Sequence, residues 1–236
     1  MPNSRPLDLS SFDGRLLDGL RFSRIVYDFF DQARSGPDGN GNLLLRKSVE
    51  EKRLVEELIP IARYVQARYR EGYRIKVRWF KGTQPYDAVL LLSGTLVERH
   101  EIPRELLLEV TTSVHKNEYL VRERLHRHGG SFGVKGTSRD KKTGDIISVP
   151  RSYSGDELVR KLTEQIVERL RSKSNKRKPY PRETVLVINC VADTIVEPSE
   201  WNDTIQRVIE ARIDFPFREV FMIEPVLWHT ATLYRH

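Results

Sequence analysis

The run Glu105-Leu-Leu-Leu-Glu-Val-Thr-Thr112 constrains the fold more than any other segment. Its density of Leu and Val is typical of a strand that is buried on both faces of a sheet. A carboxylate inside such a strand loses its hydration, so Glu109 needs a cation, a hydrogen-bond donor or a metal ion beside it. A second strand has the same pattern, because Asp87 leads into the apolar run at residues 88–92. Two acids on neighbouring buried strands can share one cation.

The composition indicates a soluble globular protein. The chain has 236 residues, of which 39 % are hydrophobic and 31 % charged. No apolar run approaches the roughly 20 residues of a membrane span, and the N-terminus lacks an apolar signal core, so we expect a cytoplasmic protein without a membrane partner. Cys190 is the only cysteine, which excludes an internal disulfide framework and a thiolate zinc site. Its place in the apolar run 185–191 predicts a small buried hydrophobe.

Positive charge is concentrated in two segments. The formal net charge is +7. Residues 116–142 carry eight Lys and Arg against three acids, and residues 171–182 carry six Lys and Arg and no acid. This distribution favours a polyanionic partner. For the second segment, a solvated loop is an equally good interpretation.

The pattern of elements predicts an α/β fold with a mixed central sheet flanked by helices. Residues 1–42 are expected to form an N-terminal appendage ending in a flexible Gly/Asn-rich loop, and residues 43–236 a single α/β domain. A helix opens at the capping box Ser48 to Glu51 and is kinked at Pro60. Further helices are expected at 116–128, from 154, and after Ser199. The expected strands are 73–80, 87–92, 105–112, 184–191, 220–223 and 227–234, with an additional two-stranded hairpin within 131–149.

The order helix–strand–strand–strand–helix–strand over residues 44–192 resembles the PD-(D/E)XK (restriction-endonuclease-like) nuclease superfamily. Pro85-Tyr86-Asp87 matches the proline–aspartate element, and Glu109-Val110-Thr111 stands at the acid–x–lysine element. The resemblance implies a restriction-endonuclease-like core and Mg²⁺-dependent hydrolysis of phosphodiester bonds, in DNA more than in RNA. It also makes Asp87 and Glu109 metal ligands, and homodimers are frequent among such enzymes.

The chemistry of the residues agrees with that implication. Mg²⁺, with Mn²⁺ as a substitute, takes oxygen ligands, and one or two carboxylates plus phosphate oxygens are a usual set. The carbonyl of Val110 can add another oxygen. A further acid from the first helix is expected at Glu57, with Glu56 as its neighbour. For each of these two, a solvated helical face is the competing interpretation.

The sequence departs from the superfamily at Thr111, where lysine is usual. We expect Lys116, beside His115, to supply the catalytic lysine, and Lys81 is the alternative. Some members of the superfamily have lost activity. A catalytically inactive domain that binds nucleic acid or a protein partner is therefore the alternative function.

Basic and polar side chains near these strands are the predicted nucleic-acid contacts, because phosphate contacts supply affinity without sequence specificity. They are Gln84, Arg122, Arg124, Arg127, Lys135, Lys141 and Lys142. Tyr119 and Phe132 either stack on bases or pack in the core. Purely structural roles remain open for both acids. Glu109 can pair with Arg74 or Arg78, and Asp87 can cap the turn that begins at Pro85.

Overall fold

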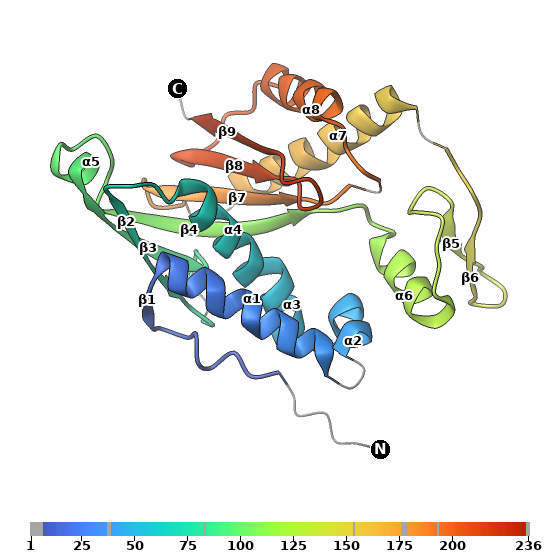
Figure 1. Ribbon diagram of the computed structural model, residues 1–236. Helices are drawn as coiled ribbons and strands as arrows, with labels where there is room; N and C mark the ends of the chain where they lie inside the picture. Colours follow the sequence, from blue (N-terminus) through green and yellow to red (C-terminus); the bar gives the residue numbers. More distant parts are fainter. Residues whose placement is uncertain are drawn as a thin grey trace.

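A computed structural model of the chain describes residues 7–36, 39–82, 84–152, 154–175, 179–192 and 194–234, with only the backbone of Asn40. Over these residues, seven strands form one mixed sheet and helices cover both of its faces (Figure 1). The prediction of an α/β fold with a mixed central sheet flanked by helices is therefore confirmed.

The strands of the sheet are β1 (Leu16–Asp18), β2 (Tyr73–Trp79), β3 (Ala88–Gly94), β4 (Glu105–Ser113), β7 (Thr184–Cys190), β8 (Glu219–Ile223) and β9 (Thr230–Tyr234). The small hairpin predicted within 131–149 consists of β5 (Thr137–Arg139) and β6 (Ile146–Ser148). The helices are α1 (Gly19–Ser35), α2 (Gly39–Leu45), α3 (Val49–Arg53), the π-helical turn η1 (Leu54–Leu58), α4 (Ile59–Arg68), α5 (Thr95–Glu98), α6 (Glu118–His128), α7 (Gly155–Ser174) and α8 (Pro198–Glu210).

The centre of the sheet is parallel and its margins are antiparallel. The strand order is β1-β2-β3-β4-β7-β8-β9; β4, β7 and β8 run parallel, and every other neighbouring pair is antiparallel. A parallel pair needs a long crossover connection. Helix α7 supplies it between β4 and β7, while α6 and the β5–β6 hairpin lie to one side of the sheet (Figure 1).

The two faces of β4 meet different helices. Leu106, Leu108 and Val110 belong to the buried cluster that includes α1 and α4. Leu186, which is the register partner of Glu109, belongs to the other cluster, with α7 and α8. Because side chains alternate along a strand, Glu109 is directed toward α7.

A π-helical turn joins α3 to α4 immediately before Pro60. Ser48 and Glu51 form the predicted capping box at the start of α3. The N–H of Ile59 then bonds to the carbonyl of Leu54, five residues earlier. Proline has no N–H to donate, so a regular α-helix would lack one backbone hydrogen bond at Pro60. The wider turn before it accommodates the proline. Glu57 lies within this turn.

The described residues among the first 42, predicted to form an appendage, contribute to the sheet and to its core. Strand β1 pairs with β2, and Leu9, Phe12, Phe22 and Val26 are buried in the same cluster as the side chains of α4. The spacing of Phe22 and Val26 places both on the buried face of α1. The Gly/Asn-rich run predicted as a loop instead starts helix α2. Residues 1–6, 37 and 38 lie outside the described residues.

Two smaller predictions concern the start of α8 and the burial of Cys190. Helix α8 is capped by Glu197 with Glu200, two residues before the predicted cap Ser199, because Pro198 fits the first helical position. Cys190 is completely buried, as predicted, and burial raises the pKa of its thiol. Across the described residues, no helix combines the length and the apolarity needed to cross a membrane.

Candidate active site

Asp87 lies where β3 separates from β4. Its backbone N–H donates to the carbonyl of Leu108 at 2.7 Å, and its carboxylate Oδ2 accepts the N–H of Val110 at 2.7 Å. The side chain thus takes the place of a backbone acceptor at the point where strand pairing ends. Val110 directly follows Glu109, so the two acids predicted to act together are brought to one point of the sheet.

Glu109 is buried and is held by a cation and a hydroxyl. Its side chain is 7 % exposed. Oε1 lies 2.6 Å from Nζ of Lys173, near the end of α7, and accepts the hydroxyl of Tyr180 at 3.1 Å. Burial, followed by the charge of Glu109, raises the pKa of the Tyr180 hydroxyl, which therefore remains a donor. The ion pair seen among the described residues is with Lys173 and not with Arg74 or Arg78.

Glu57 is close enough to Asp87 for the two charges to repel. Burial raises the pKa of Glu57 to about 7, and the charge of Asp87 is the next largest cause. The indole N–H of Trp79 donates to its carboxylate at 3.2 Å, which acts in the opposite direction. The predicted third acid therefore does lie near this place, and it carries a proton more readily than an ordinary glutamate.

Neither lysine proposed to replace the missing residue at Thr111 contacts the acids in the described residues. Lys116 is exposed beyond the carboxyl end of β4. The strand alone carries the chain about 13 Å from Glu109 before it ends, at the usual rise per residue. Lys81 pairs with Glu50 of α3. Lys173 is the cation that the tertiary structure places on Glu109.

The donor set fits a divalent cation with few protein ligands. Backbone groups of one strand residue point to the same side, so the carbonyl of Val110 lies on the side of its N–H, toward Asp87. Two carboxylates and one carbonyl leave room for water and phosphate oxygens, as Mg²⁺ prefers. The repulsion between Glu57 and Asp87 is the kind of charge imbalance that a cation relieves. Among the described residues, no three His, Cys, Asp or Glu side chains are grouped as metal ligands.

The predicted nucleic-acid contacts divide into paired and exposed residues. Arg124 donates to the carbonyl of Ile146 at 2.7 Å, Arg127 pairs with Glu123 at 2.6 Å, and Lys135 pairs with Glu157 at 2.7 Å. The Arg124 contact joins α6 to β6, the Lys135 contact joins the segment before β5 to α7, and the Arg127 pair lies within α6.

The remaining contacts differ in exposure. Burial lowers the pKa of the half-buried Arg122, and the positive charge of Arg46 lowers it further. Gln84, Lys141 and Lys142 are exposed, as are Tyr119 and Phe132 at 54 % and 56 %. The two aromatic side chains therefore do not pack in the core. Lys176, Arg177 and Lys178 of the second basic segment lie outside the described residues.

The residues that sequence reasoning missed are Lys173 and Tyr180. Both belong to the basic segment 171–182, which was noted only for its charge. That segment connects α7 to β7, and β7 lies beside β4. The available signal was therefore the crossover connection between β4 and β7. Its end brings the chain back beside β4, the strand that carries Glu109.

Comparison with known proteins supplies no family for the chain. No model of a protein family matches it, and neither does any curated protein or solved structure.

Proposed function

We propose that the protein is an Mg²⁺-dependent nuclease of the PD-(D/E)XK type, which hydrolyses phosphodiester bonds in DNA or, with lower preference, in RNA. The order α4, β2, β3, β4, α7, β7 and the parallel pairing of β4 with β7 support a restriction-endonuclease-like core. One observation carries the proposal. The carboxylate of Asp87 binds the N–H of Val110, the residue next to the buried acid Glu109.

Each residue has a defined task in this proposal. Asp87, Glu109 and the carbonyl of Val110 hold the ion, and Glu57 lies next to Asp87, where it adds negative charge once it has released its proton. Bound Mg²⁺ polarises the phosphate and lowers the pKa of an attacking water. Lys173 takes the role expected of a lysine at position 111, because its ammonium lies on Glu109 and can shift to a phosphate oxygen when the ion binds the carboxylate. Tyr180 orients Glu109 through its hydroxyl.

Nucleic acid would approach over the basic surface formed by α6 and the β5–β6 hairpin. Exposed Lys141 and Lys142 are free to make phosphate contacts without losing an internal ion pair that the described residues show. Arg127 and Lys135 would first have to leave Glu123 and Glu157. Such contacts predict binding that weakens steeply with salt and depends little on sequence.

The test is cleavage of plasmid DNA and of short DNA and RNA oligonucleotides with Mg²⁺ or Mn²⁺, against an EDTA control. Asp87→Asn should abolish metal-dependent cleavage and leave nucleic-acid binding within about twofold, because it removes a ligand charge and not a phosphate contact. Asp203→Asn, at an exposed position on α8, is the matched control and should cut normally. Cleavage at the wild-type rate by Asp87→Asn would remove this residue from the mechanism.

A catalytically inactive domain that binds nucleic acid or a protein is the second candidate. The observation that favours it is the internal neutralisation of Glu109, which already has Lys173 and Tyr180 as partners. Binding that survives EDTA, with no cleavage under any metal, selects this function over the first.

A further inference from the structure

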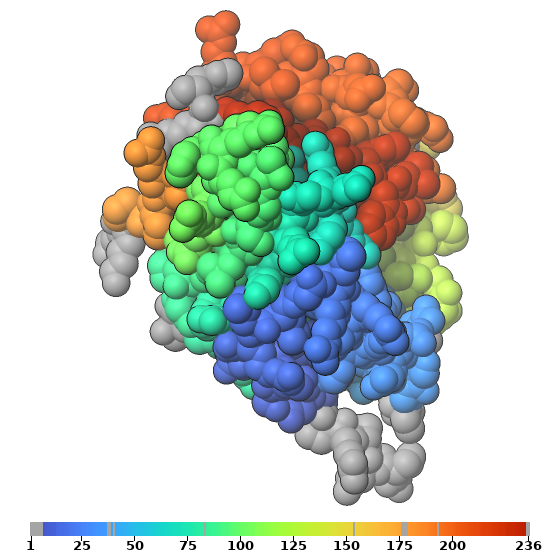
Figure 2. Space-filling model, turned by 60° about the vertical axis from the view of Figure 1, so that its left-hand side comes forward, coloured from blue at the N-terminus to red at the C-terminus, as the bar shows by residue number. Residues whose placement is uncertain are grey.

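A large cavity lies on the face of the sheet opposite to Glu109. Its volume is about 910 Å³, within the size range of pockets that hold small molecules. Its walls come from the end of α4, the start of β2, the segment after α5, and the strands β4, β8 and β9. In Figure 2, the green segment around α5, the teal segment at the start of β2 and the red C-terminal strands meet around this region.

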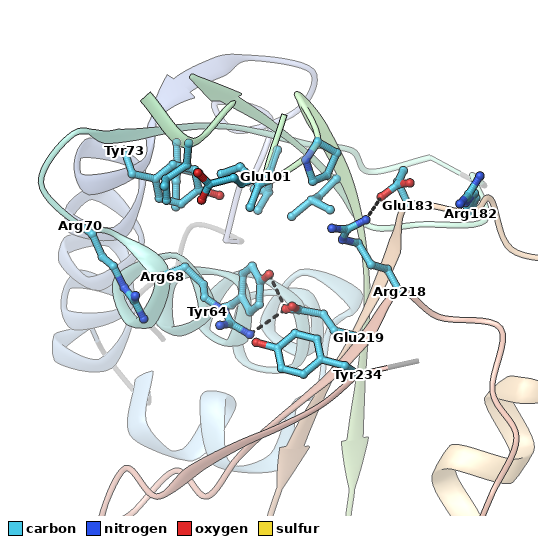
Figure 3. Close-up of a pocket in the computed structure, with 16 residues that line it drawn as sticks. Tyr64, Arg68, Arg70, Tyr73, Glu101, Arg182, Glu183, Arg218, Glu219 and Tyr234 are labelled. Atoms are coloured by element: carbon cyan, nitrogen blue, oxygen red, sulfur yellow. Dashed lines mark hydrogen bonds and ion pairs between the residues drawn. The ribbon is translucent and has the colours of Figure 1, made fainter. Parts of the chain in front are cut away.

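The floor of the cavity is a fixed polar network around Glu219. Its side chain is 10 % exposed, and Oε1 lies 2.9 Å from the guanidinium of Arg68 and accepts the hydroxyl of Tyr64 at 2.7 Å (Figure 3). The guanidinium of Arg68 also donates to the hydroxyl of Thr232 at 3.1 Å. Its Nε is buried and, among the described residues, has no hydrogen-bond partner. A buried donor of this kind is a place where a ligand or a water is needed.

The two ends of the cavity carry arginines. Arg70 and Arg182 lie at opposite ends in Figure 3, and among the residues that the structure describes neither guanidinium makes a hydrogen bond or an ion pair. Arg218 lies between them and binds Glu183 at 2.8 Å. Guanidinium groups always carry charge and offer paired donors that match phosphate oxygens. The cavity therefore presents unused cationic donors to an anion.

Aromatic and acidic groups complete the walls. Tyr73 and Glu101 lie on the wall that faces Arg68 and Tyr234 (Figure 3). Burial raises the pKa of the Tyr73 hydroxyl to about 12, so it stays a neutral donor at physiological pH. Tyrosine rings offer faces on which a flat heterocycle can stack. The carboxylate of Glu101 can accept a hydrogen bond from an amino group of that heterocycle.

From this combination we infer that the cavity is a binding site for a nucleotide, with the phosphate on Arg70 or Arg182 and the base between the tyrosine rings. A cavity of this volume, with a flat aromatic wall, acceptors in the middle and cationic donors at the ends, matches the distribution of groups in a nucleoside phosphate. The site is separate from Asp87 and Glu109, because Glu219 faces α4 and binds its Tyr64, whereas Glu109 faces α7 and binds its Lys173. The inference holds whether or not the protein is a nuclease.

The experiment is isothermal titration calorimetry of the full chain with adenosine 5′-monophosphate, in EDTA so that no metal contributes. We expect one site per chain and a loss of affinity of at least tenfold in one of the two variants Arg70→Glu and Arg182→Glu, which identifies the end that holds the phosphate. Arg74→Glu is the matched control, because Arg74 is exposed on the same strand as Tyr73 and adjacent residues of a strand point to opposite faces. Adenosine and inorganic phosphate, tested separately, should each bind more weakly than the nucleotide.

Three outcomes would overturn the inference. The first is the absence of saturable binding by the wild type. The second is affinity that falls tenfold in neither cavity variant, or that falls as much in Arg74→Glu as in the more affected one, which indicates general charge attraction. The third is binding that is retained in Arg70→Glu and Arg182→Glu but lost in Asp87→Asn, which would place the nucleotide at the candidate active site. Thermal unfolding of each variant checks that it is folded.

Discussion

Two buried glutamates on opposite faces of the sheet are held in the same way. Glu109 accepts from Lys173 and Tyr180, and Glu219 accepts from Arg68 and Tyr64. Both carboxylates thereby gain a cation and a neutral donor, which is what an acid in an apolar sheet requires.

What differs is the surroundings of the two acids. A second acid lies next to Glu109, because the carboxylate of Asp87 accepts the N–H of Val110, the residue that follows Glu109. Glu219 borders a cavity lined by four arginines and, with Glu219 itself, three glutamates. Both glutamates are therefore neutralised in the same way, but negative charge is in excess around Glu109 and positive charge around Glu219. The first suits a cation and the second an anion.

The largest effect is expected from removing Glu219, whose carboxylate is the ion-pair partner of Arg68. Glu219→Ala should destabilise the fold by about 3–5 kcal/mol, because Arg68 is left as a buried charge without its partner. Glu109→Ala should cost less, because it also removes a charge close to Asp87. Urea unfolding of both variants measures the difference, with Glu101→Ala as the exposed control. Equal losses in the two variants would show that the neighbouring acid has no energetic consequence.

The cation on Glu109 should matter for cleavage in a way that the cation on Glu219 does not. Lys173→Ala should lower the turnover number by about 10–100-fold, the usual cost of losing a group that supports a metal ligand. Lys173→Arg should restore part of it by keeping the charge. Arg171→Ala, exposed on the same helix, is the control for the loss of basic charge. A change in KM alone would mean that Lys173 only binds substrate.

The repulsion around Asp87 should make stability depend on pH. The folded pKa of Glu57 is raised from 4.5 to about 7, so the folded state holds a proton that the unfolded state has released in this interval. Stability should therefore fall as pH rises from about 4.5 to 7, by up to about 3 kcal/mol, and then level off. Glu57→Gln should remove this fall, whereas the exposed Glu98→Gln should not. Urea unfolding at several pH values from 5 to 8 tests it, and identical profiles for the wild type and Glu57→Gln would contradict it.

The smallest effect is the stabilisation by metal. Mg²⁺ at ten times its dissociation constant should add about 1.4 kcal/mol to the free energy of unfolding, since it binds only the folded state. Thermal melts with and without EDTA should show this gain in the wild type and in Glu219→Gln, and not in Asp87→Asn. A gain that persists in Asp87→Asn would place the ion elsewhere.

Much of the architecture was predictable because it depends on local pattern. The apolar runs around residues 88–92 and 105–112 and the capping box at Ser48 predicted strands and a helix that the structure contains. The alternation of side chains along β4 also predicts that Glu109 and Val110 lie on opposite faces, whichever strands are its neighbours. The run rich in Gly and Asn was wrongly predicted to be a loop, because its composition is typical of loops and does not show that Gly39–Leu45 forms a helix.

The sequence by itself determined that two acids sit at buried strands and that both need partners, because this follows from hydration and side-chain alternation alone. Only the tertiary structure decided which partners they have. Lys173 and Tyr180 are more than 60 residues from Glu109 along the chain, and Tyr64 and Arg68 are more than 150 from Glu219. Such contacts depend on how the crossover helix α7 and the helix α4 pack on the two faces of the sheet. That packing is a global balance of buried area and chain connectivity, which no local pattern contains.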